Sequence, residues 1–172
     1  MRGHYDVMPE KVRLVNDPVL RKPCQPIPLN LVSIQGLLDL MYETMTAENG
    51  IGLAANQIGH SDMVFILKDG DSYKEYVNPE ILSQEELVDF ENEGCLSIPG
   101  VVAKTKRYRK VKLQYSTKDG VVVQKDFEDI GAFAVQHEID HLNGKLYIDQ
   151  FGPVKKDMTL RKHKKFLREI GR

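Results

Sequence analysis

The sequence predicts an α+β protein that forms a single domain, residues 1–172. Its length suits one compact core. Apolar residues recur with helical spacing before and around a His-Glu-x-x-His (H-E-x-x-H) motif, and with strand-like alternation in between. We therefore expect mostly antiparallel short strands packed around a central H-E-x-x-H helix. An amphipathic helix lies towards the N-terminus in this prediction, and a further helix lies at the C-terminus.

Composition and charge indicate an ordinary globular protein. A formal net charge of −1 and 41% hydrophobic residues suggest neither DNA nor a membrane as a partner. No apolar stretch approaches the length that spans a bilayer, and residues 1–11 lack the apolar core of a signal peptide. Cys24 and Cys95 lie far apart in unlike contexts, which argues against a disulfide framework. We expect a cytoplasmic, reducing location, where a thiolate can serve as a ligand.

The N-terminal part of the chain reads as a loose leader followed by helical segments. The leader is residues 1–11. Asp17-Pro18 is typical of an N-cap with proline at the first helical position, which predicts a short helical turn. From Asn30, apolar residues recur with helical spacing until Asn49-Gly50, so an amphipathic helix is expected there. The segment Gly50–Gln57 is small and nearly uncharged, and serves either as a turn or as a place where a ligand approaches the backbone.

The middle of the chain reads as strands. Apolar and polar residues alternate, and Asp69-Gly70 and Asp119-Gly120 are turn signals. Asn78-Pro79 is expected to interrupt one strand, because proline lacks the N–H that a sheet requires. The predicted strands are residues 63–67, 73–77, 81–82, 110–115 and 121–127, and a last short strand is 146–148.

The H-E-x-x-H motif lies in a predicted helix of roughly Asp129–Asn143. Residues four apart on a helix share one face at about 6 Å, so His137 and His141 can bind one metal ion. Glu138 follows the first histidine directly and can reach a metal-bound water without binding the metal. The face of the two histidines also carries an apolar wall: Ile130, Phe133 and Ala134.

Two histidines are too few for a catalytic site, which takes three protein ligands and keeps one open position. In one large class of metalloproteases a further histidine follows six residues after the second, but Tyr147 occupies that position here. Cys95, beside Gly94, fits a site that lacks one ligand. The other candidates are the carboxylates and His4, Cys24, His60 and His163.

Three segments match, in order, the signature motifs of one enzyme family. They are Gly50–Gln57 (GIGLAANQ), Glu93–Ser97 (EGCLS) and Gln136–His141 (QHEIDH). The chain therefore resembles the bacterial-type peptide deformylases, from about Val12 to about Gln150. The leader and the basic tail lie outside this resemblance.

The resemblance implies a metal-dependent hydrolase that removes the N-formyl group from the formylmethionine of nascent polypeptides and releases formate. It implies Cys95, His137 and His141 as ligands of one divalent metal ion. That ion is natively Fe²⁺ in the family, with Zn²⁺, Ni²⁺ or Co²⁺ as substitutes. A metal-bound hydroxide would attack the formyl carbon, with Glu138 as general base and then general acid.

The resemblance also suggests how the substrate is held. The side-chain amide of Gln57 and the backbone N–H of Leu96 match the family's donors to the oxyanion of the intermediate. The peptide would pair with the backbone at Ile51 and Gly52 by strand addition. The expected substrate-binding residues are Ile51, Gly52, Glu93, Gly94, Ile130, Phe133 and Ala134.

Residues 154–172 form a predicted helix that carries eight lysines and arginines. A helix of this kind is usually solvated. The alternative is a contact with ribosomal RNA near the exit of the nascent chain, as C-terminal helices of similar deformylases make. Arg107, between Lys106 and Arg109 in the neighbouring sequence, is expected to belong to a solvated basic strand end.

Two other functions compete with the deformylase. A zinc-type peptidase would use the same helix, but Tyr147 and a cysteine ligand argue against it. A binding module with a structural metal normally closes its site with a fourth protein ligand, and no fourth Cys or His is obviously placed. That module also leaves Glu138 and Gln57 unexplained. Substitution of Glu138 by Gln separates the two classes, because only an enzyme would lose turnover while it retains the metal.

Overall fold

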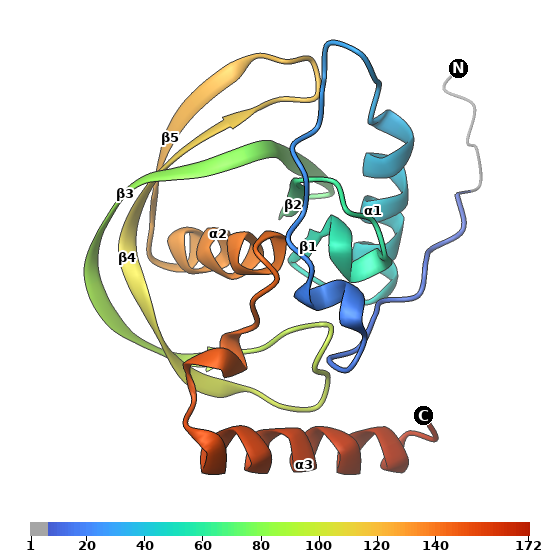
Figure 1. Ribbon diagram of the computed structural model, residues 1–172, viewed down its shortest axis with the longest axis vertical. Coiled ribbons are helices and arrows are strands. Elements are labelled where there is room, and N and C mark those ends of the chain that lie inside the picture. Colours follow the sequence, from blue (N-terminus) through green and yellow to red (C-terminus); the bar gives the residue numbers. More distant parts are fainter. Residues whose placement is uncertain (1–6) are drawn as a thin grey trace.

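A five-stranded antiparallel sheet curves around a central helix in the computed structural model, which describes residues 7–172 (Figure 1). The strands are β1 (Gly52–Ala54), β2 (Val64–Asp69), β3 (Ser72–Glu93), β4 (Ala103–Ser116) and β5 (Val122–Glu128). Each strand pairs with its neighbour in sequence, so the order in the sheet is β1-β2-β3-β4-β5. Helix α2 (Asp129–Leu142) contains the H-E-x-x-H motif and packs against β1, β2, β4 and β5. The predicted α+β single-domain architecture is confirmed.

Helix α1 (Gln35–Ala47) covers the end of the sheet formed by β1 and β2 (Figure 1). It begins after the predicted start at Asn30, because the chain first makes a turn in which the N–H groups of Leu31 and Val32 both donate to the carbonyl of Pro28. Its buried face shares one core cluster with strands β1 and β2, which includes Leu38, Met41, Met45, Leu53 and Ile66.

The predicted helical turn after Asp17 is the 3-10 helix η1 (Pro18–Arg21). The Asp17 carboxylate caps it by accepting a hydrogen bond from the backbone N–H of Val19 at 3.0 Å. Residues 1–6 of the predicted leader, and with them His4, lie outside the described residues. The N–H of Glu10 donates to the Thr44 hydroxyl of α1 at 2.9 Å, so the chain is tied to the fold from that residue onward.

The predicted break of a strand at Asn78-Pro79 is wrong, because β3 continues through it as a bulge. Its pairing with β4 shifts register between Val77 and Glu80. Asn78 adopts a left-handed conformation (φ 48°), and its side-chain amide both accepts from the N–H and donates to the carbonyl of Ile27. The bulge thus places the proline where no ladder hydrogen bond is needed.

The predicted strand 146–148 is also wrong, because this segment enters the 3-10 helix η3 (Tyr147–Gln150). The carboxylate of Asp149 accepts a hydrogen bond from the Leu146 N–H at 3.0 Å. It also forms an ion pair with Arg21 at 2.7 Å. Such a local side-chain to backbone bond competes with an extended conformation.

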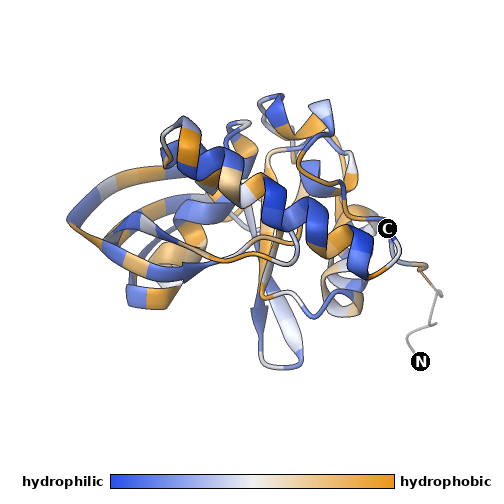
Figure 2. Ribbon diagram, turned by 90° about the horizontal axis from the view of Figure 1, so that it is seen from below, coloured by the Kyte–Doolittle hydropathy of each residue, from blue (hydrophilic) through white to orange (hydrophobic). Residues whose placement is uncertain are grey.

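Helix α3 (Pro153–Glu169) lies along one side of the molecule, below the loop that connects β3 and β4 in Figure 1. Thr159 and His163 are its buried residues. Seen from its own side, α3 presents mostly hydrophilic residues (Figure 2). Within residues 7–172, no helix is both long enough and apolar enough to cross a bilayer.

Candidate metal centre and active site

Three side chains from two distant parts of the chain meet at the inner face of α2. Helical geometry puts His137 and His141 one turn apart, and their Nε2 atoms lie 3.2 Å from each other. The loop after β3 brings the Cys95 sulfur to 3.3 Å from Nε2 of His141. The three ligand atoms lie within 4.8 Å of one another, and no other group of three such donors was found among residues 7–172.

These separations fit a metal ion. Two donors at ordinary metal–nitrogen and metal–sulfur distances, arranged tetrahedrally, lie about 3.3–3.6 Å apart. One thiolate and two imidazoles provide three protein ligands, and a tetrahedral ion would keep its fourth position for water or substrate. Tyr147, in the place of a third histidine, is buried with its ring centre 6.4 Å from that of His137, and belongs to the supporting core.

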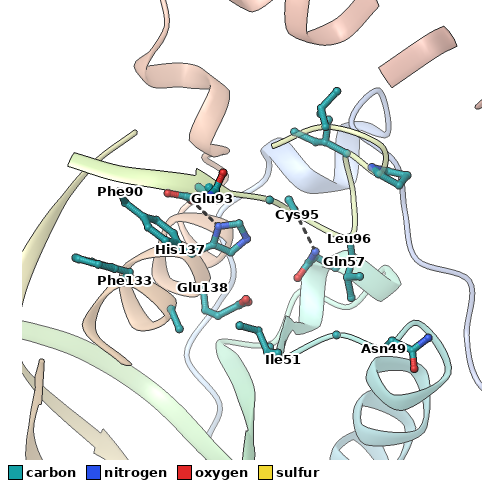
Figure 3. Close-up of a pocket in the computed structure, with 18 of the residues that line it drawn as sticks. Asn49, Ile51, Gln57, Phe90, Glu93, Cys95, Leu96, Phe133, His137 and Glu138 are labelled. Carbon is teal, nitrogen blue, oxygen red and sulfur yellow. Dashed lines mark hydrogen bonds and ion pairs between the residues drawn. The ribbon is translucent and has the colours of Figure 1, made fainter. Parts of the chain in front are cut away.

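A buried ion pair holds the first histidine from behind. An oxygen of the Glu93 carboxylate lies 2.7 Å from Nδ1 of His137, which leaves Nε2 directed at the metal position (Figure 3). Arg107 donates from two nitrogens to the same carboxylate, and Thr105 donates its hydroxyl. Burial tends to raise the pKa of Glu93, but the hydrogen bonds from His137 and Arg107 outweigh it and lower this pKa to about 2.

This arrangement corrects the expectation for Arg107. Its side chain is only 5% exposed and bridges two acids, because its third nitrogen donates to Asp140 of α2 at 2.7 Å. It is therefore no solvated strand end. Glu93 does line the pocket, as predicted for a substrate-binding residue, but its carboxylate is engaged by protein groups.

The second histidine is supported by a residue to which the sequence assigned no role. The side-chain amide of Asn56 donates to the backbone carbonyl of His141 at 2.6 Å. Asn56 and Gln57 lie in the 3-10 helix η2 (Ala55–Ile58), which follows β1 directly. Both are about 1% exposed, so this short helix is fixed against α2.

Glu138 faces the metal position from the side of β1. It is 4% exposed, and its Oε2 has no hydrogen-bond partner among the described residues. Its Oε1 occupies the space beside Gly52, where an added Cβ would lie 2.8 Å from it. Burial, more than the opposing effect of His137, raises the pKa of Glu138 to about 7. A group with such a pKa can accept and return a proton near neutral pH.

The side-chain amide of Gln57 is oriented by three contacts. Its oxygen accepts from the backbone N–H of Ala54 at 3.0 Å, so its nitrogen must face the opposite side. That nitrogen donates to the Ser97 hydroxyl at 3.1 Å and to the Cys95 sulfur at 3.7 Å (Figure 3). The amide donor and Leu96 thus both lie next to the ligand cysteine.

A cavity of about 330 Å³ opens beside the three ligands. The rings of Phe90 and Phe133 stack in its wall with centroids 4.9 Å apart. Phe90 was not predicted, because it lies in the second half of β3, beyond the predicted strands. All predicted substrate-binding residues line this cavity: Ile51, Gly52, Glu93, Gly94, Ile130, Phe133 and Ala134.

Cys24 and the other histidines among residues 7–172 lie elsewhere. His60 faces Asp62 at 3.9 Å, and His163 hydrogen-bonds the carbonyl of Pro99. Cys24 is buried in the core between the sheet and α2, where burial raises the pKa of its thiol to about 11. None of them reaches the site that Cys95 completes.

Comparison with known proteins agrees with these features. Residues 9–157 match the family model described as polypeptide deformylase. The chain is 42% identical over 142 residues to a peptide deformylase of Pseudothermotoga lettingae, covering 83% of this chain and 82% of that protein. It is 45% identical over 139 residues to one of Thermoanaerobacter pseudethanolicus, covering 81% and 87%.

Solved structures agree as well. The crystal structure of a peptide deformylase from Legionella pneumophila superposes with a TM-score of 0.90 at 37% identity, and covers 96% of this chain and 99% of that chain. The peptide deformylase of Thermus thermophilus gives 0.81 at 33% identity, with 93% and 98% covered. The chain belongs to the polypeptide deformylase family of metal-dependent hydrolases.

Proposed function

We propose that this enzyme hydrolyses the formamide of N-formylmethionyl nascent peptides, releasing formate and a free amino terminus. The observation that carries the proposal is the unpartnered, buried carboxylate oxygen of Glu138 beside the three-ligand cluster. A divalent metal held by Cys95, His137 and His141 would act as a Lewis acid that makes water acidic near neutral pH. We propose Fe²⁺ as this metal, with Zn²⁺, Ni²⁺ or Co²⁺ as substitutes, since thiolate and imidazole ligands suit all four.

Glu138 is the proton carrier in this mechanism. Its carboxylate takes the proton of the attacking water as the new C–O bond to the formyl carbon forms. The same carboxyl group then gives that proton to the amine nitrogen as the C–N bond breaks. A pKa of about 7 suits both steps, because the group is neither too weak a base nor too weak an acid.

Two donors would bind the oxygen of the formyl group as its negative charge develops. The Gln57 nitrogen is held towards Cys95 by the contacts of its own amide oxygen. The backbone N–H of Leu96 follows the ligand cysteine directly. Loss of one such donor typically costs about 3–4 kcal/mol of transition-state stabilisation.

The peptide would lie along β1. This strand is at one edge of the sheet and pairs only with β2, so its other edge is open to an added strand. Ile51 is 65% exposed at the start of this edge. The methionine side chain would enter the cavity and pack against the wall formed by Phe90, Ile130, Phe133 and Ala134.

The test is formate release from N-formyl-Met-Ala-Ser, without oxygen, by enzyme loaded with Fe²⁺ or Ni²⁺. Oxygen is excluded because Fe²⁺ and the Cys95 thiolate are both oxidisable. Glu138→Gln should retain the metal and lose turnover. Cleavage of an unformylated peptide would instead indicate a peptidase. Bound metal without hydrolysis of either peptide would indicate a structural site.

We propose further that α3 binds ribosomal RNA through its exposed face, and that the enzyme works in the cytoplasm on emerging chains. The exposed lysines and arginines of this segment are Lys155, Arg161, Lys162, Lys164, Lys165, Arg168 and Arg172. Binding to phosphates predicts steep salt dependence. Unchanged ribosome co-sedimentation at low salt after charge reversal at Lys162 and Lys165 would exclude this contact.

A further inference from the structure

Helix α3 contacts the loop that forms one side of the substrate cavity. This loop, residues 94–102, joins β3 to β4. Its first residues include Cys95 and Leu96, and its later residues 98–101 line the cavity. In Figure 1 the loop lies between α3 and the rest of the molecule.

Two side chains of α3 contact this loop and support its backbone conformation. Nδ1 of His163 donates to the carbonyl of Pro99 at 2.9 Å, and His163 is only 3% exposed. The next residue, Gly100, has a left-handed backbone (φ 87°), and the ring of Phe166 fills the space where a side chain would stand. An added Cβ at Gly100 would lie 2.1 Å from this ring. The helix therefore supports a loop conformation that requires glycine.

We propose that His163 is a positioning residue for peptide recognition: through Pro99 it holds the loop wall along which the residues after formylmethionine lie. This inference rests on the proposed function. The cavity wall of Phe90 and Phe133 receives the methionine in that proposal, and the loop runs from Cys95 away from these two rings (Figure 3). An extended peptide advances about 3.3 Å per residue, so its later residues leave the ligands and meet residues 98–101.

His163 should therefore affect the binding of the peptide and not the chemical step. The hydrogen bonds that orient Gln57, His137 and His141 do not involve α3, and the sulfur of Cys95 accepts a hydrogen bond from the N–H of Ser97 within its own turn. Leu160 of α3 also packs against the cluster of Ile98 and Tyr147, so we expect the helix to remain docked when His163 is changed. Loss of the Pro99 hydrogen bond should therefore loosen the loop wall and leave the turnover rate unchanged.

The experiment compares two substrates in the full-length, metal-loaded enzyme. They are N-formyl-Met-Ala, which ends before the loop wall, and N-formyl-Met-Ala-Ser-Lys, which reaches it. His163→Leu should raise KM for the longer peptide, by at most about the fivefold that corresponds to the free energy of one neutral buried hydrogen bond. KM for the shorter peptide and kcat for both peptides should change less than about twofold, because neither depends on the loop wall. His163→Asn should restore KM, since its amide can donate from nearly the same place.

Met158→Ala is the matched control, because Met158 is 54% exposed on the same helix and should change neither constant. If His163→Leu does not fold, Phe166→Leu tests the same wall through Gly100 and should raise KM for the longer peptide only. Equal KM values for the variant and the wild type would overturn the inference, as would equal losses on both peptides. Absence of formate release by the wild type would instead refute the proposed function.

Discussion

Removal of the buried arginine behind the metal site should cost far more than its distance from the chemistry suggests. In Arg107→Met the aliphatic length is kept, but the Glu93 carboxylate, which is 2% exposed, loses its cation. An uncompensated buried charge costs about 3–5 kcal/mol of the free energy of unfolding. For a chain of this size, each kcal/mol corresponds to about 2–4 °C, so the melting temperature should fall by about 6–20 °C.

A double-mutant cycle tests the cause of this loss. Glu93→Gln removes the charge but keeps an oxygen that can accept from Nδ1 of His137. The double variant Glu93→Gln/Arg107→Met should therefore be at least about 2 kcal/mol more stable than the sum of the two single losses predicts. Urea unfolding followed by circular dichroism, at one fixed metal concentration, gives all four free energies.

Arg109→Met is the control for this cycle. Arg109 pairs with Glu86, but the two side chains are 32% and 48% exposed and water screens the pair, so its loss should cost much less than the loss of Arg107. A cost of Arg107→Met as small as that of the control, or simple additivity of the two buried substitutions, would refute the reasoning.

Gly52→Ala should lower kcat about 10–100-fold with metal content unchanged, because the new Cβ meets the Glu138 carboxylate at 2.8 Å; full kcat in the peptide assay would contradict this. Gly144→Ala should lower the free energy of unfolding, measured with urea, by more than Gly120→Ala does. Both have positive φ (73° and 82°), but only at Gly144 does a backbone oxygen of η1 lie 2.5 Å from the added Cβ, so equal losses would exclude the clash. Asp149→Asn should cost about 1 kcal/mol at pH 7. Hydrogen bonds from a guanidinium and a backbone N–H outweigh burial and lower the pKa of Asp149, so its stabilisation is present above the ordinary carboxyl pKa and is lost as the pH falls through the folded value. The difference in the free energy of unfolding between wild type and Asp149→Asn should shrink steadily as the pH falls below the ordinary carboxyl pKa, and a difference that does not change with pH would contradict the assignment.

The sequence was sufficient to predict that His137 and His141 lie together, because their spacing is local. His137 and His141 are one helical turn apart by covalent connection alone, and the structure brings both to Cys95. The supporting layer depends on contacts between distant segments. Arg107 meets Glu93 only because two long strands pair. A signal was nevertheless present, since counting back by twos from the inward-facing Val111 reaches Arg107.

The errors in the strands have a common cause. Asn78-Pro79 and Asp149 carry real local signals, but side chains from other segments decide their outcome. The amide of Asn78 replaces backbone partners by bonding Ile27, so a strand passes through a proline. The Asp149 carboxylate accepts hydrogen bonds from the Arg21 guanidinium and from the Leu146 N–H. These bonds close a helical turn where apolar residues suggested a strand.

Strand β1 has a consequence for solubility. In the proposed function a peptide pairs with its outer edge, which must then stay uncovered, and an uncovered edge is also a template for unwanted pairing with other chains. The strand has only three residues, and one of them is glycine, which weakens any competing β-structure. Its neighbour Ile51 is nevertheless 65% exposed. We therefore expect the brevity of β1 to limit self-association of concentrated enzyme, and lengthening this strand with valine or threonine to promote aggregation, which light scattering would detect.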